Sequence, residues 1–405
     1  MAASIPWFYF YYPWVLLQVL YTKIKARTTG TQYRKWARNP HVSGNLTELA
    51  ALFDLPPPVL KDAVPGPISN YLAKNKSKAT QILGTVPPHY NEAFGAYARW
   101  YVKRNPEDLV ILFLHGGGYL LQMTPAYLEA FNSIIGLLPA DKRNKVSVLI
   151  LDYDLASTGA AFPRQLQQAY DTYTKLLEDG YTNIGVMGDS AGGHLTLTLL
   201  QQLKARGSPV YPNKIILSSP WTKLLTTALD HVPGNSAYDN DGRDAIRFSF
   251  ASNQPLVSGF IGTHDVSSAQ VSPGNADWAT AGWDKIPSLT SPKCDVFFIT
   301  GEDELFLDQD NEFAYHVLGV PFLKNKYGNS NGKFDRAIHE YIRRDSPDKV
   351  NVWAYVEPWG IHDSFVLSED DLADKVAARK VTIATVDRVR YFAIPRIVDF
   401  LYETI

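Results

Sequence analysis

A short glycine-rich segment, Gly188-Asp189-Ser190-Ala191-Gly192, is the part of the sequence best suited to covalent chemistry. It has the form G-x-S-x-G, in which small flanking residues allow a turn so tight that the serine side chain projects clear of the backbone. The apolar run at residues 183–187 is typical of a buried strand, and residues 191–200 follow a helical pattern. A strand, a tight turn and a helix in this order predict Ser190 as a nucleophile. A glycine-rich turn without chemistry is the alternative.

A second glycine-rich segment, His115-Gly116-Gly117-Gly118-Tyr119, follows the apolar run at residues 109–114. Three consecutive glycines are compatible with a merely flexible turn. However, backbone N–H groups that point inward at a developing oxyanion need conformations that side chains would obstruct. Lipases and esterases carry an oxyanion loop of this H-G-G-G form. We therefore predict that Gly116, Gly117 and Gly118, with Ala191 after the serine, supply the oxyanion-binding amides.

These two segments together resemble the hormone-sensitive-lipase-like branch of the α/β-hydrolases, because they stand in that family's order and at about its spacing. The resemblance covers roughly residues 95–400. It implies an α/β fold with a mostly parallel sheet and helices on both faces. It also implies a cap built from the N-terminal segment and an insertion, and a serine esterase that needs no metal or organic cofactor. Steryl acetyl hydrolases and arylacetamide deacetylases belong to this branch.

The general base is sought among the histidines that follow the acid, since this fold places its triad in the order serine, acid, histidine. His362 follows a predicted strand at residues 350–356, in a loop that resembles the family's histidine loop. A base on a loop beyond the carboxyl end of a strand can reach the nucleophile. His316 lies in a helical pattern and His339 in a charged segment, so both are interpreted as solvent-facing or helix-packing residues.

The acid comes from the carboxylate-rich segment at residues 301–308. The family pattern places the catalytic acid four residues before an aspartate, with an apolar residue after it, and Glu304 fits this spacing to Asp308. Glutamate replaces the commoner aspartate here, so Asp303 remains a rival. Asp308 is interpreted as a helix N-terminal charge, and Asp189 as a structural carboxylate.

Strand and helix patterns alternate along the catalytic region, which favours a mostly parallel sheet between two layers of helices. We expect an N-terminal anchor (residues 1–28), a segment contributing to a cap (29–95) and a catalytic domain (96–405) with a cap insertion at about 220–292. The strands are expected at residues 96–103, 109–114, 146–151, 183–187, 214–218, 295–300 and 350–356. Residues 165–178 are expected to form a helix with an apolar core stripe, and residues 384–402 a closing helix that Pro395 should kink. Residues 327–349 are expected to form an exposed loop and a short charged helix.

The composition excludes some classes of function. The chain has 405 residues, with 39 Lys and Arg against 41 Asp and Glu, so no basic excess points to nucleic acid. The single cysteine, Cys294, cannot form an intramolecular disulfide and begins an apolar run, so we expect it in the core.

The N-terminus is apolar and aromatic from residue 5 to residue 21, and Lys23, Lys25 and Arg27 follow. A cleaved signal peptide would carry basic residues before the apolar stretch, and a spanning helix needs about 20 apolar residues without an interruption such as Pro13. We therefore expect a membrane anchor that is interfacial or a marginal span, the endoplasmic reticulum being one such membrane. The alternative is an aromatic arm over a pocket or a dimer face. The basic flank favours a cytosolic catalytic domain.

The expected reaction is acyl transfer through an acyl-enzyme, with Ser190 as nucleophile, His362 as base and Glu304 as the residue that orients the imidazole. The aromatic insertion and the N-terminus suggest a lipophilic ester. The resemblance implies removal of a short acyl group, such as acetyl, from a sterol- or terpenoid-like alcohol. A tailoring hydrolase of secondary metabolism, a condensation or cyclisation enzyme, and a non-catalytic small-molecule receptor remain alternatives.

Overall fold

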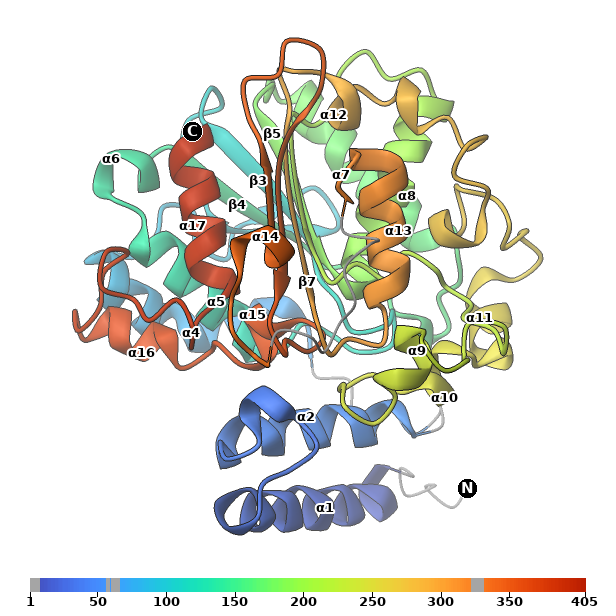
Figure 1. Cartoon of the computed structure of the whole chain (residues 1–405). Coiled ribbons are helices and arrows are strands. Elements are labelled where there is room, and N and C mark those ends of the chain that lie inside the picture. Colours follow the sequence, from blue (N-terminus) through green and yellow to red (C-terminus); the bar gives the residue numbers. More distant parts are fainter. Residues whose placement is uncertain (1–7, 56–58, 60–65, 322–330) are drawn as a thin grey trace, which may run out of the picture.

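The computed structural model describes residues 8–55, 59, 66–321 and 331–405, which form one mixed sheet flanked by helices (Figure 1). In these residues the sheet has nine strands in the order β1-β2-β4-β3-β5-β6-β7-β9-β8. The strands are β1 (Ala93–Phe94), β2 (Ala98–Val102), β3 (Leu109–Leu114), β4 (Val146–Leu151), β5 (Ile184–Asp189), β6 (Lys214–Ser218), β7 (Asp295–Gly301), β8 (Glu340–Arg343) and β9 (Asn351–Glu357).

The middle of the sheet is parallel, from β4 through β3, β5, β6 and β7 to β9, and both edges are antiparallel. The strands β3, β4, β5 and β6 are buried along their whole length, as expected of parallel strands covered on both faces. The predicted mostly parallel sheet is therefore confirmed. The carboxyl ends of the parallel strands β5, β7 and β9 lie at the same end of the sheet, where the loops that follow them can form one site.

Helices cover both faces of the sheet. One core lies between the sheet and α7, α8 and α13, and the other lies between the sheet and α5, α15, α16 and α17. The helices are α1 (Phe8–Thr28), α2 (Pro40–Phe53), α4 (Ile68–Leu83), α5 (Pro125–Leu137), α6 (Ala140–Arg143), α7 (Arg164–Glu178), α8 (Ser190–Ala205), α9 (Ser236–Asp239), α10 (Phe248–Ala251), α11 (Gln254–Ile261), α12 (Pro287–Thr290), α13 (Leu307–Leu318), α14 (Arg336–His339), α15 (Ser364–Leu367), α16 (Leu372–Ala377) and α17 (Ala393–Thr404). The 3₁₀ turns are η1 (Arg34–Trp36), η2 (Ala156–Thr158), η3 (Pro273–Asn275) and η4 (Trp283–Lys285).

Two local predictions are wrong. The closing helix begins at Ala393 and is not kinked in its middle, because Pro395 lies in its first turn, where its missing N–H costs no helical hydrogen bond. The predicted loop and helix at residues 327–349 lie partly outside the described residues. The described part contains α14 and an unexpected strand, β8, which pairs antiparallel with β9 and completes that edge of the sheet.

The helices α1 and α2 lie together below the end of the sheet that carries the β5, β7 and β9 loops, and α9 and α10 of the insertion lie above the right-hand end of α2 in this view, with α11 further to the right (Figure 1). The contact between α1 and α2 is apolar, with Val15 and Val19 packed near Ala51. Cys294 is buried, as predicted.

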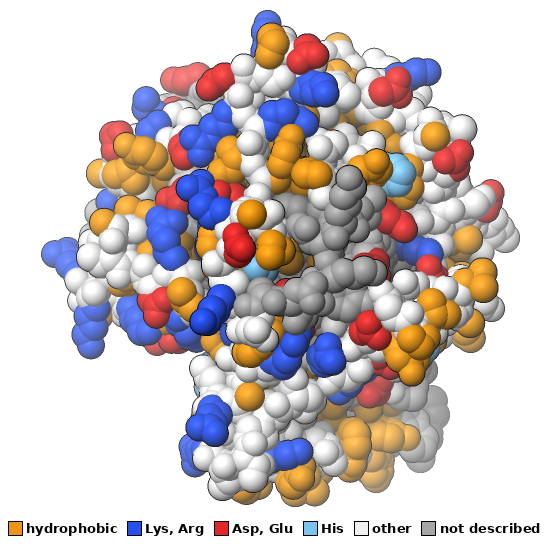
Figure 2. Space-filling view, in the orientation of Figure 1, with side chains coloured by type: hydrophobic (Ala, Val, Ile, Leu, Met, Phe, Trp, Pro, Cys, Tyr) orange, Lys and Arg blue, Asp and Glu red, His pale blue; other side chains and the backbone are white. Residues whose placement is uncertain are grey.

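The exposed surface of α1 is also apolar. Its large side chains that face outward include Tyr9, Phe10, Trp14, Leu17, Leu20, Tyr21 and Ile24. Hydrophobic side chains gather at the bottom of the molecule in Figure 2, where α1 lies in the same orientation. In the described part of the chain no helix combines the length and the apolar character that crossing a membrane requires. A spanning form of the predicted anchor is therefore not supported, and residues 1–7 of that anchor lie outside the described residues.

Candidate active site

The turn between β5 and α8 places Ser190 in a strained conformation. Its φ is +47°, in the left-handed region that residues with a side chain rarely adopt. Backbone crowding fixes the neighbouring glycines, since a Cβ on Gly188 would lie 2.3 Å from the Gly192 carbonyl oxygen, and one on Gly192 would lie 1.9 Å from that of Leu114. The sequence G-x-S-x-G therefore folds into the tight turn predicted for it, with the serine at its apex.

The structure brings Ser190, His362 and Glu304 into one hydrogen-bonded chain. Ser190 Oγ lies 2.8 Å from His362 Nε2, and His362 Nδ1 lies 3.3 Å from Glu304 Oε2. The three side chains come from the loops after β5, β9 and β7, and all are buried. This order of hydroxyl, imidazole and carboxylate is the arrangement of a serine nucleophile, its base and an orienting acid.

The structure also distinguishes Glu304 from its rival. Asp303 forms an ion pair with Arg34, which lies in η1 and stacks over the Trp359 ring. Glu304 Oε1 accepts hydrogen bonds from Ser219 Oγ (2.6 Å) and from the Gly301 N–H (2.5 Å). Both oxygens of the Glu304 carboxylate are therefore used, and one of them faces His362.

Two of the three glycines of the oxyanion loop, Gly117 and Gly118, have N–H groups that could donate to an oxyanion. Gly117 and Gly118 have φ values of +103° and +61°, which glycine adopts without strain. Among the described residues, neither of their N–H groups has an acceptor. The Ala191 N–H lies in the first turn of α8, where helical amides have no intrahelical partner.

The prediction that Gly116 supplies an oxyanion donor is wrong. The Gly116 N–H donates to Asp189 Oδ1 (3.1 Å), and Tyr127 Oη donates to Asp189 Oδ2 (2.7 Å). Asp189 thus holds the glycine loop against the nucleophile turn, which makes it the structural carboxylate that the sequence predicts. Burial raises the pKa of Asp189 to about 6.

The electrostatics of the pocket favour a protonated imidazole. Burial alone would lower the pKa of His362, but the hydrogen bond and charge of Glu304, followed by the charges of Asp244 and Asp189, outweigh burial and raise it. Burial, with the charges of Asp189 and Glu304, raises the pKa of Asp363 well above its usual range. Asp363 Oδ2 lies 3.2 Å from His362 Nε2, so a second carboxyl group borders the reacting atoms.

A narrow pocket of about 40 Å³ opens over Ser190 and His362. Its walls include Leu49 and Phe53 of α2, so the N-terminal segment covers the reacting atoms. Phe53 also lines a wider neighbouring groove of about 440 Å³ together with Phe250 of α10. Phe53 therefore borders both cavities, and its ring centroid lies 4.6 Å from that of Phe250.

Several functional residues have no motif of their own in the sequence. Ser219, Tyr127, Asp363, Arg34 and Asp244 all contact the triad or its loops. Asp363 follows His362 directly, and Ser219 follows β6, which are weak positional signals. Arg34 and Asp244 offered none.

The two histidines considered and set aside as the general base, His316 and His339, contact residues outside the triad. His316 is exposed on α13 and stacks on Trp278. His339 is buried, not solvent-facing, and lies 3.8 Å from Glu302. In the part of the chain that the structure describes, no group of three or more His, Cys, Asp or Glu side chains is arranged to hold a metal ion.

Comparison with known proteins places this geometry in a family. Residues 87–341 match the model of the steryl acetyl hydrolase family. A Schizosaccharomyces pombe protein, mug81, provisionally named a steryl acetyl hydrolase, is 29% identical over 257 residues, 60% of this chain and 65% of that protein. Steryl acetyl hydrolase 1 of Saccharomyces cerevisiae is 28% identical over 219 residues, 51% of this chain and 47% of that protein. The matched region thus spans between about half and two thirds of these relatives.

A solved structure of an esterase from the bacterial hormone-sensitive lipase family shares the fold. Its TM-score is 0.52 at 19% identity, covering 89% of this chain and 98% of that one. A double mutant of the esterase E40 gives 0.53 at 20% identity, with the same coverage. The fold is therefore the α/β-hydrolase fold, as the two glycine-rich segments predict. With the family model matching well over half of its length, the chain belongs to the steryl acetyl hydrolase family of hormone-sensitive-lipase-like α/β-hydrolases.

Proposed function

We propose that the protein is a serine esterase that removes a short acyl group from a lipophilic alcohol through an acyl-enzyme. The observation that carries this proposal is the buried chain from Ser190 through His362 to Glu304, which lies beside two glycine amides without acceptors among the described residues. Each element of that arrangement has a defined task in ester hydrolysis.

The steps follow from the atoms in place. Ser190 Oγ attacks the ester carbonyl carbon while its proton moves to His362 Nε2, and Glu304 stabilises the imidazolium through Nδ1–H. The amides of Gly117, Gly118 and Ala191 bind the oxyanion, each worth about 3 kcal/mol. Nε2–H then protonates the departing alkoxide, and the acyl group stays on Ser190. Water then attacks the acyl carbon while one of its protons moves to His362 Nε2; the bond from that carbon to Ser190 Oγ breaks, Nε2–H returns the proton to Oγ, and the carboxylic acid leaves.

The two compartments suggest how the substrate is divided. The pocket of about 40 Å³ over Ser190 accommodates a small acyl group such as acetyl. The groove of about 440 Å³ beyond Phe53 is lined largely by apolar side chains and suits a bulky alcohol. Together with the relatives named as steryl acetyl hydrolases, this favours acetylated sterol- or terpenoid-like alcohols as substrates. The residues of α2 and α10 that separate the compartments act as a cap.

A chain-length series tests this division. For p-nitrophenyl esters we expect kcat/KM to fall from acetate through butyrate to octanoate, and we expect acetate release from acetylated sterols. Phe53→Ala joins the pocket to the groove, so it should raise kcat/KM for octanoate relative to acetate about tenfold.

Phe248→Ala is the matched control. Phe248 lies in α10 and stacks on His231 without lining either compartment. The dependence of kcat/KM on acyl chain length in Phe248→Ala should therefore match that of the wild type. An octanoate preference in the wild type, or an unchanged profile in Phe53→Ala, would contradict the proposed division. Turnover of simple esters without any acetate from sterols would instead favour a tailoring hydrolase.

We also propose that α1 binds the membrane surface. Most of its outward side chains from Tyr9 to Ile24 are large and apolar, and Lys23, Lys25 and Arg27 lie towards its C-terminal end. Trp and Tyr side chains are enriched at membrane–water interfaces, and basic side chains are attracted to anionic lipid headgroups. Since α1 packs on α2, this placement brings the cap close to lipophilic substrate.

Vesicle sedimentation tests the surface contact. The full chain should sediment with vesicles of phosphatidylcholine and phosphatidylserine, and Leu17→Ser/Leu20→Ser should lower the bound fraction at least severalfold, because both side chains are more than half exposed. Leu229→Ser is the control, since Leu229 is an exposed leucine of the insertion and not of α1. Equal sedimentation of the two variants would remove the support for this contact.

A further inference from the structure

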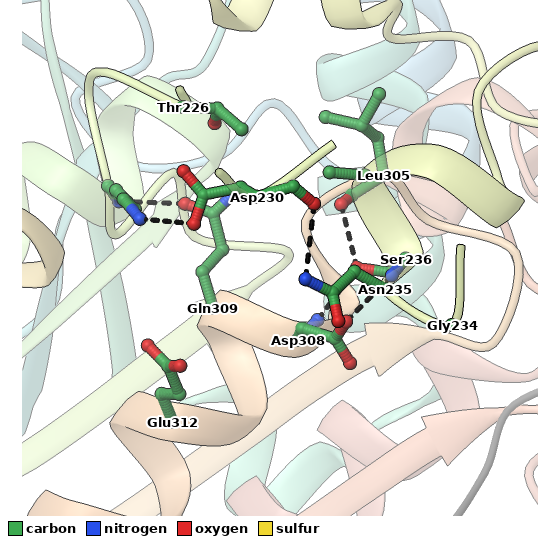
Figure 3. Close-up of a pocket in the computed structure, with 11 residues that line it drawn as sticks. Thr226, Asp230, Gly234, Asn235, Ser236, Leu305, Asp308, Gln309 and Glu312 are labelled. Carbon is green, nitrogen blue, oxygen red and sulfur yellow. Dashed lines mark hydrogen bonds and ion pairs between the residues drawn. The ribbon is translucent and has the colours of Figure 1, made fainter. Parts of the chain in front are cut away.

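The insertion between β6 and β7 contacts both loops that carry the base and the acid. Its residues 235–245, here called the clasp segment, include α9 and the turn that follows it. At one end of the clasp segment, Ser236 Oγ donates to the Leu305 carbonyl (3.0 Å) and accepts from the Asp308 N–H (3.0 Å), while the Ser236 N–H donates to Asp308 Oδ2 (2.6 Å; Figure 3). The acid loop is therefore held at the start of α13, beside a polar pocket of about 220 Å³.

In the middle of the clasp segment, the Asn240 side chain extends the same contact. Its Nδ2 group donates to the carbonyl oxygens of Glu302 (3.1 Å) and Glu304 (2.8 Å). Asn240 is fully buried. These hydrogen bonds hold the backbone of the acid loop at Glu304, which faces the imidazole, and at Glu302.

Asp244, at the other end of the clasp segment, joins the acid loop to the histidine loop. Its Oδ1 accepts from the backbone N–H of His362 (2.9 Å) and from its neighbour Ala245 (2.7 Å), and its Oδ2 accepts from the backbone N–H of Leu305 (2.9 Å). Asp244 is fully buried. A single carboxylate therefore sets the separation between the backbones that carry the base and the acid.

We infer that Asp244 is a positioning residue of the catalytic triad, which fixes Glu304 relative to His362 and supports the positive charge on the imidazole during turnover. This inference rests on the proposed serine esterase function. Asp244 lines neither the catalytic pocket nor the groove, so it acts through its two loops and not on the substrate.

The charged groups around His362 and Asp244 determine the direction in which a loss of the Asp244 charge shifts the pKa of His362. His362 is faced by Glu304, Asp244, Asp189 and Asp363, all acidic. Asp244 in turn is faced by His362, Glu304, Asp310 and the Tyr33 hydroxyl.

Burial raises the pKa of Asp244 to about 6, so the group carries its charge at neutral pH. Removing that charge lowers the pKa of His362, because one of the anions that stabilise the imidazolium is lost. The base must be neutral to accept the serine proton, and activity is therefore lost as the pH falls through the pKa of His362. The acidic limb of the pH profile should move to lower pH when Asp244 is neutralised.

Asp244→Asn tests the inference with p-nitrophenyl acetate. Asparagine retains one acceptor oxygen but places an NH₂ group against a backbone N–H. Either the acid loop or the histidine loop therefore loses its hydrogen bond to residue 244. We expect kcat to fall about 10- to 100-fold with KM within a factor of two or three. The acidic midpoint of kcat/KM should shift down by about 0.5–1 pH unit. Asp241→Asn is the matched control, because the Asp241 side chain lies in the same segment but contacts the Phe248 N–H and His231, and both kcat and the midpoint should match the wild type.

A second variant separates position from charge. Asn240→Ala removes two bonds to the acid loop without changing charge, so it should lower kcat about tenfold with an unmoved acidic midpoint. This variant also serves if Asp244→Asn does not fold. Unchanged kcat in the folded variants, or an unmoved midpoint in Asp244→Asn, would overturn the inference. If instead the wild type neither turns over esters nor reacts with a fluorophosphonate at Ser190, the proposed function itself fails.

Discussion

Ser190→Ala is expected to lower kcat for p-nitrophenyl acetate by about 10⁴- to 10⁶-fold, which is the loss seen when the nucleophile of a serine hydrolase is removed. Alanine leaves His362 without a hydroxyl to deprotonate, and no acyl-enzyme can form. The hydroxyl lies 2.8 Å from Nε2, and the oxyanion amides stay in place in the variant. The residual rate should reflect these amides and substrate binding alone.

The labelling pattern provides an independent measurement. A fluorophosphonate should modify the wild type at Ser190, found by mass spectrometry of the labelled peptide, and should leave Ser190→Ala unlabelled. Circular dichroism and the thermal midpoint of the variant serve as the folding control. A wild-type protein that resists labelling but binds a lipophilic ligand would favour the receptor alternative.

Glu304→Ala is expected to lower kcat by about 10³- to 10⁴-fold, whereas Asp303→Ala should lower it by about tenfold or less. The Glu304 carboxylate faces Nδ1 and holds the imidazole in the tautomer that accepts the serine proton, and loss of that group in other triads costs about 10⁴-fold. Asp303 pairs with Arg34 and affects the imidazole only through the loop.

The comparison needs a control for that ion pair. Asp303→Ala leaves Arg34 without its carboxylate, so Arg34→Ala/Asp303→Ala should recover part of any loss in thermal stability while kcat stays near that of Asp303→Ala. Losses of equal size for the two acids, or a larger loss for Asp303→Ala, would reverse the assignment.

The sequence was sufficient for those parts of the site whose conformation is set by neighbouring residues. The turn around Ser190 requires Gly188 because the backbone of Gly192 approaches it within the same turn, and such local crowding is visible in the sequence as the G-x-S-x-G pattern. The strands β3 and β6 were bounded correctly because parallel strands buried on both faces are continuous apolar runs.

Other features depend on contacts that adjacent residues do not determine. Glu304 and Asp303 are neighbours, and the choice between them depends on Arg34, which lies about 270 residues earlier. Gly116 is equivalent to Gly117 in the sequence, but its amide donates to Asp189. The role of Asp244 depends on the path of an insertion whose sequence is irregular, so no periodicity indicates which of its carboxylates turns inward.

The ion pair between Arg34 and Asp303 joins residues separated by 269 positions, and the pair between Lys35 and Glu357 joins residues separated by 322. Contacts of such high sequence separation form late, since the intervening chain must first be ordered. On the ribosome, η1 emerges long before either carboxylate has been synthesised. Neither ion pair can therefore form before residue 303 or residue 357, respectively, has been synthesised, and hydrolytic competence should appear late in folding.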